Sequence, residues 1–281
     1  MKKYTIGLYE KAMPSTLTWK EKLAAAKEAG FDFVEISIDE TDEKLARLEW
    51  TKEERLELIK AMYETGISIR SMCLSGHRKY PLGSSKPDVR ERGMEIMEKA
   101  LELADDLGIR IIQLAGYDVY YEEGTAKTEQ LFDRNLKKAV EMAATLGIVM
   151  GFETMETDFM NTVEKSMHYV NKNQSPYLHV YPDCGNITNA AVSQGGNVLD
   201  DMDTGRGHMV AMHLKETKPG IFRDMLFGEG DVDFESIISK AWEHGIRRYV
   251  TEFWYLGTED WKKDLTESNQ KMKEILDRQD S

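Results

Sequence analysis

The sequence predicts an α/β fold, a single-domain (β/α)8 TIM barrel over residues 1–281. Short apolar runs of strand type alternate eight times with amphipathic segments of helix type, and dividing 281 residues by eight gives about 35, the size of one βα unit. No linker, low-complexity tract or change in composition interrupts this alternation, and no glycine-rich dinucleotide fingerprint follows the first run. Eight such units close into a parallel barrel more readily than they form an open doubly wound sheet.

The expected strands are short apolar runs, and glycines mark the ends of several of the helices that precede them. We expect strands at residues 4–8, 33–38, 68–74, 109–114, within 148–156, and at 178–181, 210–215 and 249–252. We expect helices at residues 18–29, 51–65, 89–107 and 127–146, from 161 or 162 onward, and at 197–204, 234–243 and 261–276.

Composition excludes several classes of protein. The net charge of −13, from 37 basic and 50 acidic residues, repels nucleic acids and anionic membranes. The N-terminal residues are too polar for a signal peptide, and no run approaches the roughly 20 apolar residues of a membrane helix. Cys73 and Cys184 are the only cysteines, which excludes a disulfide scaffold or a cysteine-based zinc site. Free thiols in a reducing cytosol fit best, so the expected location is cytoplasmic.

Four of the later apolar runs end on side chains that bind metals, namely Glu153, Asp183, His213 and Glu252. Their separations are 30 (183 minus 153), 30 (213 minus 183) and 39 (252 minus 213), each about one βα unit. The C-terminal ends of parallel barrel strands share one face, where barrel enzymes carry their active sites. Three carboxylates there would repel each other unless a cation neutralised them. One imidazole and three carboxylates suit a single divalent ion: Mn²⁺, Mg²⁺, Co²⁺ or Zn²⁺.

Each of these residues also has a structural explanation. His213 alone is consistent with a core histidine bonded to a carbonyl group, and Asp183 with a turn residue or a helix cap. Glu252 is consistent with a carboxylate paired with a neighbouring arginine, and Glu153 with the point where a strand reaches the surface. Their common position at the ends of four consecutive strands favours the metal site.

At these four residues the chain resembles the xylose-isomerase-like TIM barrels. Within that group it is most similar to the L-ribulose-5-phosphate (L-xylulose-5-phosphate) 3-epimerases of L-ascorbate degradation and pentose phosphate catabolism. The similarity runs over nearly the whole chain and is most specific in CLSGHRKYPLGS (73–84), IRIIQLAGYDVYY (109–121), YPDCGN (181–186), HLKETKPGIF (213–222) and FGEGDVDF (227–234). One position departs from the related epimerases that do not require a phosphate: they often carry a histidine three residues after the aspartate ligand, where this chain has Asn186.

The resemblance implies a metal-dependent isomerase that inverts C3 of a ketopentose 5-phosphate through a cis-enediolate. The metal would hold the C2 carbonyl oxygen and the C3 hydroxyl group, while Glu153 and Glu252 act as acid and base on opposite faces of the sugar. The implied partner is thus a small sugar phosphate. The resemblance also leaves open a homodimer. Its interface would be formed by loop 75–87 or by the aromatic residues 253–255, which we expect to be exposed.

A phosphate group requires cationic or backbone N–H donors, which barrels often place in loops after the last strands. The candidates for substrate or phosphate binding are His77, Arg78, Lys215, Lys218, Arg223, Glu35 and Asn186. Each basic residue is also consistent with a solvated loop charge. For Glu35 a contact with a substrate hydroxyl and a buried salt bridge remain equally open.

The nearest alternatives are an unphosphorylated ketose 3-epimerase and an aldose–ketose isomerase of the same superfamily. A DNA repair enzyme of the endonuclease IV type is disfavoured by the net charge of −13 and by a total of only six histidines. A non-catalytic sugar-binding barrel is disfavoured because it has no use for two metal-linked carboxylates.

Overall fold

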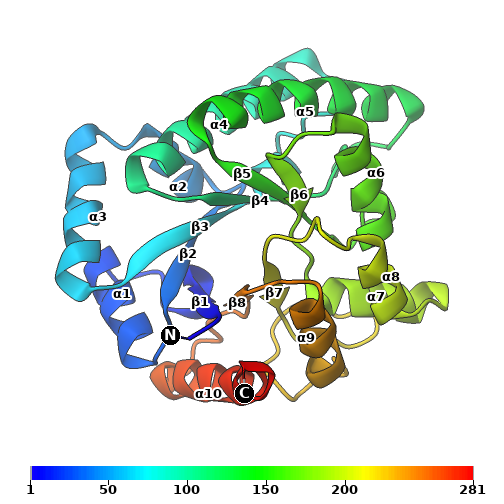
Figure 1. The fold of residues 1–281 in the computed structure, drawn as a ribbon. Helices are drawn as coiled ribbons and strands as arrows, with labels where there is room; N and C mark the ends of the chain where they lie inside the picture. Colours follow the sequence, from blue (N-terminus) through cyan, green and yellow to red (C-terminus); the bar gives the residue numbers. More distant parts are fainter. Residues whose placement is uncertain (1, 281) are drawn as a thin grey trace.

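The computed structural model describes residues 2–280, and its eight strands form one parallel sheet that curls into a barrel (Figure 1). The strand order is β6-β5-β4-β3-β2-β1-β8-β7. Between β6 and β7 the barrel closes through isolated parallel bridges, Val180 with Met209 and Asp183 with His213. The predicted (β/α)8 fold is therefore confirmed. The strands are β1 (Thr5–Tyr9), β2 (Phe33–Ile38), β3 (Ser68–Leu74), β4 (Ile111–Ala115), β5 (Val149–Glu153), β6 (Leu178–Val180), β7 (Met212–Leu214) and β8 (Arg248–Thr251).

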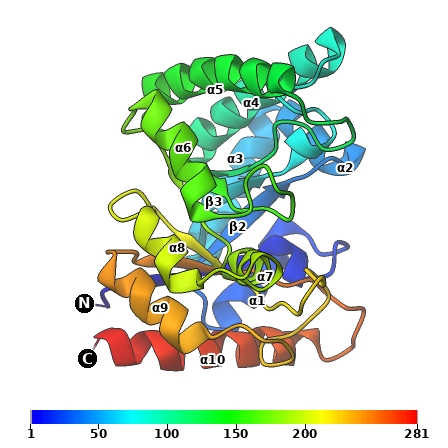
Figure 2. The ribbon, with the colours of Figure 1, turned by 90° about the vertical axis from the view of Figure 1, so that its right-hand side faces the viewer.

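The helices form an outer ring around the strands, and the two ends of the chain lie side by side (Figures 1 and 2). The Lys3 ammonium lies 3.0 Å from Asp280 at this junction. The α-helices are α1 (Trp19–Glu28), α2 (Asp42–Leu45), α3 (Lys52–Thr65), α4 (Pro87–Leu107), α5 (Ala126–Leu146), α6 (Val163–Asn173), α7 (Cys184–Gln194), α8 (Val198–Thr204), α9 (Phe234–Glu243) and α10 (Trp261–Asp280). Three short 3-10 helices, η1 (Glu10–Ala12), η2 (Ala46–Glu49) and η3 (Gly76–Arg78), lie in loops after strands or beside α2.

Local sequence explains where most helices begin and end. Thr51 caps α3 by accepting a hydrogen bond from the Glu54 backbone N–H, and the Glu54 carboxylate accepts one from Thr51 in return. Gly108 ends α4 with a φ of 71°, a left-handed conformation that a residue with a Cβ rarely adopts. These signals make the observed boundaries of α3 and α4 agree with the expected ones to within two residues.

The structure also differs from the expected elements. Helix α7 was not predicted, because its sequence CGNITNAAVSQ is small and polar and lacks a clear apolar period. Strand β7 covers only Met212–Leu214 rather than 210–215, and α10 continues to Asp280 rather than ending at 276.

Of the three aromatic residues expected to be exposed after β8, Phe253 is buried. It packs against Phe227 with ring centroids 5.8 Å apart, so the expectation of an exposed patch is wrong at this position. Trp254 is half-buried and Tyr255 is exposed. Within residues 2–280, no helix has both the length and the apolar content to cross a membrane.

Apolar side chains fill the middle of the barrel, while its end at the C-termini of the strands, called the upper end here, is polar. The interior cluster consists of Tyr9, Phe33, Cys73, Ile111, Tyr181, Ala211 and Val250. This packed layer is typical of TIM barrels, whose interior is a core and not a pore. It forms the floor on which the polar groups at the C-terminal ends of the strands rest.

A buried ionic cluster anchors the first two βα units. The Glu10 carboxylate, fully buried after β1, accepts hydrogen bonds from Lys22 of α1 at 3.0 Å, from Lys44 of α2 at 3.3 Å and from Arg47 of η2. The Ser37 backbone N–H of β2 also donates to it at 2.7 Å. Burial raises the pKa of Glu10, but the charges of Arg47, Lys22 and Lys44 outweigh burial and lower that pKa to about 2.

We expect Glu10→Ala to lower the free energy of unfolding by about 3–5 kcal/mol, because it leaves buried cations without their partner. Since the folded pKa lies below the ordinary value of 4.5, this stabilisation is complete above that pH and is lost as the pH falls toward 2. Urea unfolding at pH 7 measures the loss. Glu28→Ala, which removes an exposed pair with Lys262, is the matched control and should leave the unfolding midpoint unchanged. Equal midpoints for Glu10→Ala and wild type would contradict this role.

Candidate metal centre

Four side chains from successive strand ends converge at the upper end of the barrel. Glu153 is the last residue of β5, Asp183 follows β6 as the N-cap of α7, His213 lies within β7, and Glu252 follows β8. One ligand atom from each lies within 4.8 Å of the others, and all four residues are buried. The structure thus brings together the four residues that the sequence singled out.

The histidine ring presents one nitrogen to the carboxylates. His213 Nδ1 lies 2.9 Å from Glu252 Oε2, 3.3 Å from Glu153 Oε1 and 4.0 Å from Asp183 Oδ2. The Gln113 amide of β4 donates a hydrogen bond to the other oxygen of Glu153. Asp183 Oδ1 accepts the Asn186 backbone N–H at 2.7 Å, so Oδ2 is the atom left facing the cluster.

The residues present fit a divalent cation. Asp183 Oδ2 and Glu252 Oε2 are buried and accept no hydrogen bond of good geometry among the described residues, although Lys215 Nζ and His213 Nδ1 lie 3.0 and 2.9 Å away. Buried oxygens of this kind are costly unless a cation or a donor satisfies them. Three carboxylate oxygens and one imidazole nitrogen are ligands that divalent ions bind.

Lys215 supplies a positive charge beside the cluster. Its ammonium lies 3.0 Å from Asp183 Oδ2, donates to Asn186 Oδ1 at 2.8 Å, and lies 3.9 Å from Glu252 Oε2. The Asn186 side chain is itself held by a 2.7 Å hydrogen bond to the Thr154 carbonyl. Burial lowers the pKa of Lys215, but the carboxylates around it reverse the effect and raise that pKa, so the side chain remains charged.

Burial and mutual repulsion separate the pKa values of the three carboxyl groups. Burial raises the pKa of Asp183; Lys215 opposes this and Glu252 adds to it, and the resulting pKa is about 8. Burial, together with the charge of Glu252, also raises the pKa of Glu153. For Glu252, burial is outweighed by Lys215 and His213, which lower its pKa below the ordinary range. Without a cation, the cluster therefore retains a proton at neutral pH.

Glu35 lies behind His213. Its Oε1 lies 2.6 Å from His213 Nε2, and the Tyr181 hydroxyl donates to its Oε2 at 3.0 Å. Glu35 has no exposed surface and does not line the cavity above the cluster. Of the two expectations for this residue, the geometry matches a buried polar pair and not a contact with a substrate hydroxyl.

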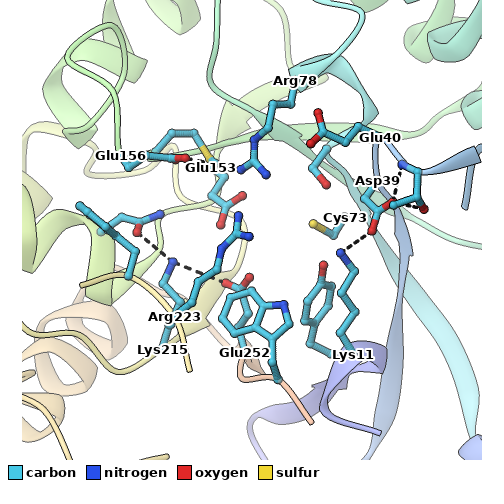
Figure 3. Close-up of a pocket in the computed structure, with 17 residues that line it drawn as sticks. Lys11, Asp39, Glu40, Cys73, Arg78, Glu153, Glu156, Lys215, Arg223 and Glu252 are labelled. Carbon is cyan, nitrogen blue, oxygen red and sulfur yellow. Dashed lines mark hydrogen bonds and ion pairs between the residues drawn. The ribbon is translucent and has the colours of Figure 1, made fainter. Parts of the chain in front are cut away.

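A cavity of about 210 Å³ opens at the cluster, where Glu153 and Glu252 form part of its lining (Figure 3). This volume is below the ~300–1,000 Å³ typical of sites for drug-sized ligands, so the cavity suits a small molecule. It is lined by Tyr9, Lys11, Asp39, Glu40, Thr41, Cys73, Ser75, Arg78, Glu153, Met155, Glu156, Asn186, Lys215, Phe222, Arg223, Glu252 and Trp254.

Three basic side chains of the loops line this cavity in addition to Lys215. Arg78, after β3, donates to the Tyr117 hydroxyl at 3.0 Å and lies 3.5 Å from Glu156 Oε1. Arg223, after β7, stacks over the Trp254 ring at 5.5 Å, and no carboxylate within residues 2–280 forms an ion pair with it. Lys11, after β1, pairs with Asp39 at 2.5 Å. Figure 3 shows these cations on different sides of the cavity.

Two of the basic residues named from the sequence lie elsewhere. His77 is buried, its Nε2 contacts the Gly93 carbonyl of α4 at 3.0 Å, and burial lowers its pKa to about 4. It shares η3 with Arg78, and the tight turn directs these adjacent side chains to different sides. Lys218 is exposed, and its backbone pairs with that of Ile221. The structure brings neither His77 nor Lys218 to the cavity.

Sequence reasoning missed several residues of the cavity wall. Asp39 directly follows β2, and Lys11 lies two residues after β1. The strand-end argument that located the metal ligands, applied to the first two strands, would have found both. No sequence signal marks Glu156, which reaches Tyr117 at 2.6 Å and Tyr120 at 3.2 Å.

Comparisons with known proteins agree with this geometry. A family model described as "Xylose isomerase-like TIM barrel" matches residues 23–275. The chain is 45% identical over 260 residues to L-ribulose-5-phosphate 3-epimerase UlaE of Escherichia coli O157:H7 and to the protein of the same name from Shigella sonnei (strain Ss046). The match covers 92% of this chain and 90% of each relative.

Two solved structures share the fold at low sequence identity. D-psicose 3-epimerase with D-tagatose from Clostridium cellulolyticum H10 is 14% identical, with a TM-score of 0.81, and the match covers 97% of this chain and 99% of that one. A structure of L-ribulose 3-epimerase is 18% identical, with a TM-score of 0.79, over 98% and 95% of the two chains. At these identities the similarity concerns the fold alone.

A cation must displace the protons held by the cluster, and the pKa values of both Asp183 and His213 are raised, so we expect Mn²⁺ affinity to rise as the pH increases through the neutral range. Each displaced proton gives about a tenfold gain per pH unit below the pKa of its group. Calorimetric titrations in two buffers with different ionisation enthalpies measure both the affinity and the number of protons released. An affinity that does not change with pH, with no proton released, would contradict this electrostatic account.

Proposed function

The chain belongs to the xylose isomerase-like TIM barrel family, and we propose that this protein inverts C3 of a ketopentose 5-phosphate, interconverting L-ribulose 5-phosphate and L-xylulose 5-phosphate. The observation that carries the proposal is the pair Glu153 and Glu252. They come from β5 and β8, three strands apart in the closed barrel, and both line the same cavity. The 45% identity to an L-ribulose-5-phosphate 3-epimerase supports this choice of reaction and substrate.

Inversion at C3 needs two groups, one that removes the proton from one face of the sugar and one that returns a proton to the other face. In the cluster without a cation, the surroundings of Glu153 raise its pKa and those of Glu252 lower its pKa. Two carboxyl groups with separated pKa values can hold one proton between them, so one is the acid while the other is the base. When the reaction runs backwards, the two glutamates exchange roles.

The remaining polar groups bind and orient the substrate. A single divalent ion (Mn²⁺, Mg²⁺, Co²⁺ or Zn²⁺), held by Glu153, Asp183, His213 and Glu252, would stabilise the negative charge that develops on the C2 and C3 oxygens of the enediolate. The Lys215 ammonium, fixed by Asp183 and Asn186, is available to donate a hydrogen bond to a substrate oxygen in the cavity. Met155, Phe222 and Trp254 add apolar wall that limits the access of water.

The phosphate group of the substrate is proposed to lie between Arg78 and Arg223. Guanidinium groups bind phosphate oxygens through two parallel N–H donors. Arg223 forms no ion pair with a carboxylate within residues 2–280, so it is free to take an anion from solution. Lys11 also lines the cavity, on another side and paired with Asp39, and is not part of the proposed phosphate site. His77 and Lys218, named from the sequence for this role, do not reach the cavity and are not part of the proposed phosphate site.

An unphosphorylated ketose 3-epimerase is the second candidate, since the same carboxylates would serve that reaction. The two guanidinium groups of Arg78 and Arg223 in the cavity lining favour the phosphorylated substrate. An aldose–ketose isomerase is disfavoured because a proton shift between neighbouring carbons through an enediolate can use one face of the sugar and does not need two opposed carboxyl groups.

Proton NMR of L-ribulose 5-phosphate in D₂O tests the proposed function. With Mn²⁺ removed after turnover, we expect loss of the C3 proton signal and appearance of the L-xylulose epimer, and we expect neither when a chelator is added first. Glu153→Gln and Glu252→Gln should each lower epimerisation by about 10²–10⁴-fold, the contribution of a general acid or base. Because Gln keeps an oxygen ligand, part of the metal affinity should remain. Exchange at C3 in a variant that carries both substitutions would contradict the two-base scheme. Exchange with the free ketose alone would favour the second candidate.

Arg223→Ala and Arg78→Ala should raise the KM for the sugar phosphate about 10–100-fold, the loss of one charge-assisted hydrogen bond. The kcat/KM for the unphosphorylated ketose should remain unchanged, because that substrate lacks the group they bind. Lys218→Ala, a cation outside the cavity in the same loop as Arg223, is the matched control and should leave both values unchanged. An equal loss with both substrates would argue that these arginines act on the sugar or on the fold and not on phosphate.

A further inference from the structure

Glu35 is a buried carboxylate for which the proposed reaction provides no use. It lies on β2, where it pairs in register with Tyr9 of β1 and with Ser71 of β3, and it has no exposed surface. Both of its oxygens are occupied: Oε1 by His213 Nε2 at 2.6 Å and Oε2 by the Tyr181 hydroxyl at 3.0 Å. The carboxylate therefore points at the back of the imidazole ring, away from the metal ligands and the cavity.

We propose that Glu35 and Tyr181 form a positioning pair that holds His213 in the ring orientation and tautomer needed to bind the metal. A metal ligand must offer a nitrogen lone pair, and His213 Nδ1 is the nitrogen that faces the other three ligands. The one remaining ring proton must then lie on Nε2. Glu35 Oε1 is placed to accept it, and a carboxylate, unlike an amide or a hydroxyl group, offers no hydrogen that would favour the other tautomer.

The pair is itself held rigidly. Tyr181 is fully buried, and its ring packs edge-on against the His213 ring with centroids 4.9 Å apart. Tyr9 packs against the imidazole from another strand at 6.3 Å. Since Tyr181 both contacts the imidazole and donates to Glu35, it fixes the distance between them. Neither Glu35 nor Tyr181 touches the cavity, so both are positioning residues and not catalytic ones.

A purely stabilising role explains this arrangement less well. Burying a carboxylate carries a desolvation cost that its interactions with polar partners often fail to recover in full, so an apolar side chain would serve the core at least as well. A carboxylate behind a metal-binding histidine has two specific effects: it sets the tautomer and increases the basicity of the ligand. Loss of such a partner typically weakens metal binding by about 10–100-fold.

Metal affinity measured on the full-length protein tests this inference. For Zn²⁺ and Mn²⁺, we expect Glu35→Leu to weaken binding about 10–100-fold. Glu35→Gln, whose amide oxygen can still accept the Nε2 proton, should lose less, and Tyr181→Phe should lose least because it leaves the carboxylate in place. Ser71→Ala is the matched control, because Ser71 is buried in register with Glu35 and its hydroxyl has no hydrogen-bond partner among the described residues. The metal affinity of this variant should match that of the wild-type protein.

Two further readouts separate positioning from a structural role. In the Zn²⁺-loaded wild-type protein, ¹⁵N NMR should show His213 with its proton on Nε2. This signal should shift or be lost in Glu35→Leu. The signal is assigned to His213 by its absence from the spectrum of His213→Ala. The rise in Tm on adding Zn²⁺ should shrink in the Glu35 variants, whatever their metal-free Tm. If Glu35→Leu does not fold, Glu35→Gln and Tyr181→Phe carry the same comparison.

The inference rests on the metal centre of the proposed function, and the two can fail separately. Wild-type protein that binds no divalent ion would overturn the metal centre and the positioning pair together. Wild-type protein that binds the ion, with folded Glu35 variants of unchanged affinity and unchanged His213 resonances, would overturn only the positioning pair.

Discussion

The concentration of negative charge at the upper end of the barrel is the constraint on which the rest of the site depends. Three buried carboxylates have oxygens within 4.8 Å of one another and of His213. Such a group is unstable without positive charge close by. Lys215 supplies part of it, and the donor set fits a divalent ion that would supply more. Burial and the charge of Glu252 raise the pKa of Glu153, while Lys215 and His213 outweigh burial and lower that of Glu252.

The fold and the site are built from the same backbone contacts. The barrel closes between β6 and β7 partly through the parallel bridge of Asp183 with His213, two residues of the metal cluster. Asp183 also caps the N-terminus of α7, where its Oδ1 accepts the Asn186 N–H and leaves Oδ2 to the cluster. A change that loosened this closure would therefore also separate the ligands. The spacing of the cluster is set by hydrogen bonds of the sheet rather than by flexible loops.

Above this rigid base, the cavity wall comes from loops of several βα units. The chain as a whole has a net charge of −13, yet Arg78, Arg223 and Lys11 all line the cavity. Cations placed in a cavity of an otherwise acidic protein direct an anionic group of a ligand to that place. This division between a metal cluster on strand ends and basic residues on loops matches a substrate with a reacting sugar at one end and a phosphate at the other.

The sequence by itself determined the eight βα repeats, the closed barrel and the four side chains that converge, because the period of the chain fixes where parallel strands end. Only the tertiary structure decided which loop side chains reach the cavity. Arg78 lines it while its neighbour His77 turns toward α4, and Glu35 lies behind His213 although 178 residues separate them in the sequence. The direction of a loop side chain depends on what packs against it from distant parts of the chain, and no local pattern records those contacts. The same reason explains why α7 was missed: its cap, Asp183, is visible in the sequence, but its burial against the neighbouring strands is not.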